Sequence, residues 1–96
     1  MESIAGAGLA IREAKDNNAT TYAPLALRIA EDKLIAAKAA AEKEEFLKAK
    51  RLADEAMMDA KLAGAQSLSE KAKKQAQEMR DSIDTLRREI ERTQMQ

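Results

Sequence analysis

The 96-residue chain suits one domain with a modest core, and its 17 basic and 17 acidic side chains leave no net charge. About a fifth of it is alanine and only 2% is aromatic, which argues against a sheet and predicts an all-α fold. Balanced charge disfavours a nucleic-acid partner, and no apolar run approaches the roughly 18 residues of a membrane span, so direct membrane insertion is not expected. The chain lacks histidine and cysteine, and we expect neither enzymatic activity nor a cofactor.

The first helix is predicted over residues 3–16. Its apolar side chains recur every three or four residues, which places them on one helical face: Ile4, Ala7, Ile11 and Ala14. Asparagine tolerates the left-handed conformation that often ends helices, so Asn17 and Asn18 are expected to stop this one. Residues 17–22 are then predicted to be a polar connector.

The second helix is predicted over residues 24–42. Pro24 marks its start, because the backbone N–H groups of the first turn have no partner within the helix, and proline lacks this N–H. One face carries apolar residues at heptad-like spacing: Leu27, Ala30, Leu34, Ala37 and Ala41. The end of this helix is left open, since no glycine or proline occurs between Leu25 and Ala63. Either a turn in the charged run 42–45 or one continuous helix fits the pattern.

The third helix is predicted over residues 45–66. Alanines recur along it at 4-3-4-3 spacing, forming an alanine seam that lets another helix approach closely: Ala49, Ala53, Ala56, Ala60 and Ala63. Larger neighbours, Phe46, Leu52 and Met57, are expected to widen the buried face.

Beyond Gly64 the apolar pattern changes phase, and residues 67–96 are predicted to extend the third helix. A new heptad series runs through this extension: Leu62, Ala65, Ser69, Ala72, Ala76, Met79, Ile83, Leu86 and Ile90. One helix over residues 46–94 would span about 70 Å, which exceeds the reach of the two shorter helices. Part of it must therefore be bare or paired, and the series either docks back on its own chain or forms a coiled coil with a second copy or a partner.

We expect no catalytic, cofactor or metal site, and instead a candidate interaction surface: Met57, Met58, Leu62, Leu68, Met79, Ile83, Leu86 and Ile90. Methionine suits adaptable binding surfaces, and one of the adjacent pair Met57 and Met58 must point away from the alanine seam. A binding module should leave a concave apolar groove around the first four of these residues, whereas a spacer should not.

The segment from Tyr22 to Ala65 carries a further pattern. It reads Tyr22-Ala23-Pro24-x-x-Leu27, then Glu45-Phe46-x-x-Ala49, then regularly spaced alanines. This resembles an uncharacterised alanine-rich helical domain of small bacterial envelope lipoproteins, often found upstream of an OmpA-type domain. The resemblance implies a helical hairpin with its turn before Phe46, where the family usually has glycine and this chain has Glu44. It also implies the periplasm, with an outer-membrane anchor on a lipidated N-terminus preceding this chain.

Together these expectations describe a helical core over residues 1–66 and a heptad-patterned extension over residues 67–96. The second and third helices form an antiparallel hairpin, and the first packs along it. The expected function is a non-enzymatic structural or scaffolding module of the bacterial cell envelope, which assembles through its C-terminal helix or with another envelope protein. The alternative is a helical protein- or peptide-binding module, since residues 41–56 resemble a tetratricopeptide half-repeat. A cytoplasmic location stays open.

Overall fold

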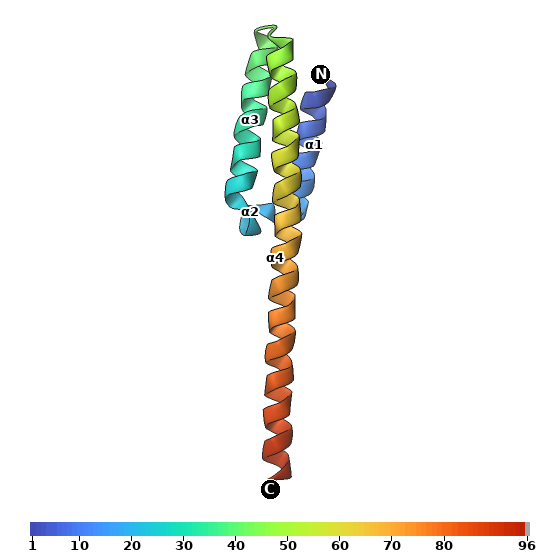
Figure 1. Cartoon of the computed structure of the whole chain (residues 1–96), viewed down its shortest axis with the longest axis vertical. Helices are drawn as coiled ribbons and strands as arrows, with labels where there is room; N and C mark the ends of the chain where they lie inside the picture. The colour runs from blue at the N-terminus through green and yellow to red at the C-terminus, as the bar shows by residue number, and fades with distance from the viewer. Residues whose placement is uncertain (96) are drawn as a thin grey trace.

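The computed structural model describes residues 1–95, and the regular structure among these residues is entirely helical. Its elements are α1 (Glu2–Asp16), α2 (Ala19–Tyr22), α3 (Pro24–Glu42) and α4 (Phe46–Gln94). Figure 1 shows α1 and α3 lying along the same half of α4, with α2 joining them across it. The molecule measures 78 × 18 × 14 Å because the other half of α4 extends alone. The predicted all-α fold, a helical hairpin with a short N-terminal helix and a long C-terminal one, is confirmed.

The segment between α1 and α3 differs from the predicted connector, because it contains the short helix α2. Asn18 ends α1 in the left-handed conformation, with a φ of 67°, as the asparagine pair predicts. The carbonyl of Asn18 then accepts hydrogen bonds from the backbone N–H groups of Thr21 and Tyr22, at 3.0 Å each. Ala19 is fully buried, so α2 is held by packing as well as by these bonds. Pro24 is the first residue of α3, as expected.

A tight turn separates α3 from α4, which excludes the continuous helix. The N–H of Glu45 bonds to the carbonyl of Ala40 at 2.9 Å, and that of Glu44 to the carbonyl of Ala41 at 3.0 Å. This pair of bonds is the Schellman motif, which requires a left-handed residue between the helix cap and the chain that leaves it. Glu44 occupies that position with a φ of 61°. The turn therefore lies where the family resemblance places it. Its left-handed position is occupied by a glutamate, whose side chain makes that backbone conformation unfavourable.

Replacing Glu44 with glycine should stabilise the protein by about 0.5–1 kcal/mol. A residue with a side chain is destabilised in the left-handed backbone conformation, and glycine removes this free-energy cost. The greater conformational freedom of glycine in the unfolded chain offsets part of the gain. Urea unfolding followed by circular dichroism measures the change. The adjacent Lys43→Gly variant is the control, because the φ of Lys43 is −85° and glycine brings no relief there. Equal effects of the two substitutions would contradict this explanation.

The core is a close contact of helices lined mainly by alanine. The five alanines of the predicted seam on α4 are fully buried, and they face buried residues of the other helices: Ala7, Ala10, Ile11 and Ala14 of α1, and Leu27, Ala30, Ala37 and Ala40 of α3. Leu34 and Leu52 pack at the edges of this core. Phe46 does not widen it as predicted, since it is the first residue of α4 and is more than half exposed. Ala41 is only half-buried, and Ala40 takes the inward position.

Ion pairs join neighbouring helices around this thin core. The ammonium of Lys33 on α3 lies 2.7 Å from the carboxylate of Asp59 on α4, and both side chains are about two-thirds covered. This close contact with the Asp59 carboxylate raises the pKa of Lys33. Lys15 on α1 lies 3.5 Å from Glu31 on α3, in a more exposed pair. Water screens such partly exposed pairs, so they help determine which helix faces meet more than they stabilise the fold.

Gly8 in α1 offers a simple stabilising substitution. A methyl group added there would meet no atom within 4 Å, so Gly8→Ala should stabilise the protein by about 1 kcal/mol through helix propensity alone. At Gly6 the same methyl group would lie 2.7 Å from the terminal carbon of Met57, which must move aside. Thermal melts should therefore show a larger gain for Gly8→Ala than for Gly6→Ala, and the reverse order would contradict the packing of α1 described here.

Candidate interaction surface

The packed part of the molecule ends at Ser67. This residue is fully buried, and its hydroxyl donates a 2.8 Å hydrogen bond to the carbonyl of Ala63. Continuing the buried 4-3 spacing beyond Ser67 leads only to polar side chains: Glu70, Lys74, Gln77 and Asp81. From residue 68 to residue 95 every residue is exposed except Lys71, which is half-buried. We call residues 1–67 the headpiece and residues 68–95 the tail.

A second series of residues runs along the opposite face of α4. Each member in the headpiece follows a buried position by two residues, as Met58 follows Ala56 and Leu62 follows Ala60. Two residues turn a helix by about 200°, so this series faces away from α1 and α3. It continues at unbroken 4-3 spacing through the tail and forms what we call the heptad stripe: Met58, Leu62, Ala65, Ser69, Ala72, Ala76, Met79, Ile83, Leu86 and Ile90.

The heptad stripe is uncovered along its whole length. Among its large members, Met79 is 66% exposed, Ile83 47% and Ile90 57%, although leucine, isoleucine and methionine are normally buried. Within the described residues the stripe does not dock back on its own chain, because the tail passes beyond the ends of α1 and α3 (Figure 1). Exposed apolar faces are typical of interaction sites, so the heptad stripe is the candidate interaction surface.

The structure separates Met57 from the other predicted surface residues. Met57 is partly buried and packs against both halves of the core, so it lies apart from the exposed face that carries the other predicted surface residues. Met58 and Leu62 belong to the heptad stripe on the far face. One of the two adjacent methionines had to point away from the alanine seam, and it is Met58. Leu68 is exposed and borders a hollow between α1 and α4, beside Ala14 and Gly64. These four residues therefore do not line one common groove, and the tail carries the larger apolar surface.

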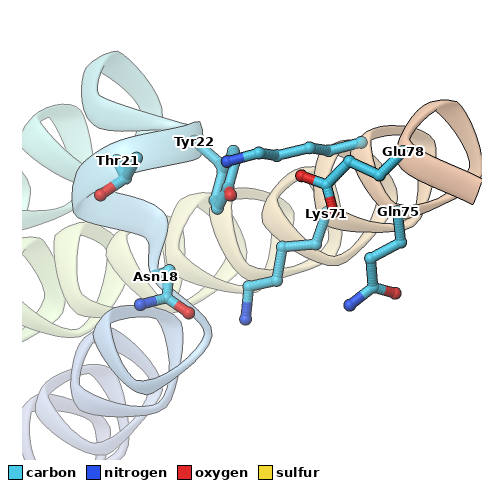
Figure 2. A pocket seen from close by; sticks show the side chains of 7 residues that line it. Asn18, Thr21, Tyr22, Lys71, Gln75 and Glu78 are labelled. Atoms are coloured by element: carbon cyan, nitrogen blue, oxygen red, sulfur yellow. The ribbon is translucent and has the colours of Figure 1, made fainter. Parts of the chain in front are cut away.

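Figure 2 shows a polar hollow at the junction of headpiece and tail, which the sequence did not predict. Tyr22, at the end of α2, lies over α4 near Lys71, Gln75 and Glu78 (Figure 2). These residues come together only because α2 crosses α4, and a four-residue helix gives no periodic signal. The residues that line the hollow are polar and of mixed charge. We infer that the hollow forms where α2 stops covering α4.

In residues 1–95, no three acidic side chains lie close enough together to hold a metal ion. Within the same residues, no helix combines the length and the hydropathy that crossing a bilayer requires.

The geometry defines an all-α protein in which a compact helical headpiece carries a long, exposed helix. A family model described as "Domain of unknown function (DUF4398)" matches residues 2–79, and the chain belongs to this family. The match covers the headpiece and reaches Met79 in the tail. No curated protein and no solved structure matches the chain. The resemblance to an uncharacterised domain family, drawn from the pattern around Tyr22, Ala23 and Pro24, is confirmed at this level.

Proposed function

We propose that this protein is a non-enzymatic scaffolding module of the bacterial cell envelope, which works as a rigid spacer and assembly element. The observation that carries the proposal is the uncovered heptad stripe on a tail that no other part of the described chain touches beyond the junction with α2. A bare amphipathic helix of this length is stable in water mainly when packing covers its apolar face. The tail is therefore best explained as one half of an assembly contact.

The positions of the two ends support a spacer role. The N-terminus lies beside the half of α4 that α1 and α3 cover, whereas the C-terminal end of α4 lies at the far tip of the tail (Figure 1). A chain held at a surface by its N-terminal end would project the tail away from that surface. The molecule is 78 Å long, so the heptad stripe would be presented well clear of the point of attachment.

The location in this proposal is the periplasm, with attachment to the outer membrane through a lipidated segment preceding Met1. Its support is the resemblance to domains of small envelope lipoproteins. Cell fractionation tests it: cells producing the protein from its natural gene are opened by osmotic shock, and their membranes are separated on a density gradient. We expect the protein in the outer-membrane fraction. Recovery of the protein with cytoplasmic markers would contradict the envelope role.

A further inference from the structure

We propose that the heptad stripe pairs with the heptad stripe of a second copy of this chain, in a parallel, in-register, two-stranded coiled coil. This inference rests on the proposed scaffolding function and names the partner and the orientation of the same surface. It is carried by three features of α4: the identity of the stripe residues in the last heptads, the charges that flank the stripe, and the position of the stripe relative to the headpiece.

The stripe residues alternate between the two core positions of a coiled coil, called a and d. Position a holds Leu62, Ser69, Ala76, Ile83 and Ile90, and position d holds Met58, Ala65, Ala72, Met79 and Leu86, with Thr93 as the next d position beyond the stripe. β-branched residues at a with leucine at d favour two parallel strands, and the last heptads follow this rule with Ile83, Leu86 and Ile90. The alanines and the serine nearer the headpiece contribute less, so the tip of the tail is the strongest part of the contact.

The charges flanking the stripe select the parallel orientation. Position e, directly after each d, is basic three times in succession: Lys73, Arg80 and Arg87. In a parallel pair, each e side chain faces the g position five residues earlier in the other copy. Arg80 then faces Gln75 and Arg87 faces Ser82, both uncharged, and Lys73 can lay its aliphatic stem on Leu68. No like charges meet at these three e–g pairs.

An antiparallel pair of the same helices would bring basic side chains together. In that orientation e positions face e positions, so pairing the strong ends of two tails sets Arg80 of each copy near Arg87 of the other. Like charges in such neighbouring positions repel each other. The basic flank therefore disfavours the antiparallel arrangement without penalising the parallel one.

The headpiece leaves room for the second copy. The stripe lies on the face of α4 opposite the alanine seam, so a second α4 can approach without displacing α1 or α3. Small residues at Ala65, Ser69 and Ala72 let the two helices come close where the headpieces end. In the parallel arrangement both headpieces lie at the same end, which suits two chains attached at their N-terminal ends to one surface.

Single cysteines placed in the 96-residue chain test the identity of the partner and the orientation of the pair together, because these 96 residues contain no cysteine. Ala72→Cys and Thr93→Cys introduce thiols at two d positions, 21 residues apart. Thr85→Cys is the matched control on the opposite face, since both threonines are exposed and donate to the carbonyl four residues earlier, at 3.0 and 2.9 Å. Each variant is oxidised mildly at several protein concentrations, alone and in an equimolar mixture of the first two. Non-reducing gels and mass spectrometry then identify the disulfide-linked pairs.

A parallel, in-register pair brings each d position against the same position of the other copy. We therefore expect Ala72→Cys and Thr93→Cys each to form covalent dimers at least tenfold more than Thr85→Cys, with the 72-to-93 pair at the control level in the mixture. Predominant 72-to-93 linkage would overturn the parallel orientation and leave the scaffold proposal standing. Linkage at the control level for both variants alone and also for the 72-to-93 pair in the mixture would overturn pairing with a second copy. Neither result bears on the proposed envelope location, which cell fractionation tests separately.

Discussion

Ala53→Glu is expected to unfold the headpiece. Ala53 is fully buried in the seam where α4 meets its neighbours, and a core lined by alanine has no space for a longer side chain. The new carboxylate would be removed from water without a partner, a cost of several kcal/mol that adds to the cost of forcing the helices apart. A domain of this size is stable by only about 5–15 kcal/mol, so most of that stability should be lost.

Ala36→Glu is the matched control for this experiment. Ala36 lies in the middle of α3 but is exposed, so the same added charge stays in water and should change the free energy of unfolding by less than about 0.5 kcal/mol. Thermal melts followed by circular dichroism compare the two variants with the natural chain. An unchanged melt for Ala53→Glu would show that the alanine seam is not buried and that the hairpin is wrong.

Leu27→Ala is expected to cost about 2–4 kcal/mol of stability. Leu27 and Ile11 are the large aliphatic side chains buried in a core that is otherwise mostly alanine, and Leu27 is 5% exposed. Truncation removes its transfer free energy and leaves a cavity, and the rigid helices around it can close that cavity only in part. Because the core has few large residues, this single change should remove a large share of the total stability.

Leu25→Ala isolates the effect of burial, because Leu25 lies two residues away on the same helix and is 73% exposed. Chemical denaturation should show a shift of less than about 0.5 kcal/mol for Leu25→Ala. Comparable losses for the two leucines would mean that α3 does not bury the face assigned to it here.

Spacing alone predicted the helical segments that form α1, α3 and α4, and most of their buried faces. The alanine seam of α4 is buried as predicted, and so are Ala7, Ile11 and Ala14 of α1, because helical periodicity places such residues on one side. The prediction placed Ala41 on the buried face of α3, but Ala40 is buried and Ala41 is only half-buried. A strict heptad drifts around a straight helix by about 20° per repeat, so the register of the last turn depends on how the helices cross.

Local signals failed at the two connections. Helix α2 has four residues, fewer than periodicity can detect, and it depends on packing of Ala19 against the headpiece. The α3–α4 turn lacks the glycine that usually announces a Schellman motif, and Glu44 adopts the left-handed conformation instead. Docking of α4 on α3 supplies the energy that this conformation costs, which no local sequence feature could show.

The candidate surface was predicted in part. The heptad series of the tail was visible in the sequence, but whether it folds back depended on where α1 and α3 end. Met57 adjoins Met58 in the sequence, and only the packed core shows which of the two points inward. The basic flank Lys73, Arg80 and Arg87 repeats every seven residues and could have been found by reading the positions beside the stripe.

Sedimentation equilibrium over a wide range of concentrations tests the central claim that the tail assembles this protein. We expect the mass of the natural chain to rise from its monomer value of 10.5 kDa towards twice that value. Ile83→Asp, at the centre of the strong end of the stripe, should remain a monomer with an unchanged headpiece melt. Ile35→Asp, at an exposed isoleucine of α3, should behave like the natural chain. A natural chain that stays monomeric throughout, or equal association by the Ile83→Asp variant, would contradict the account.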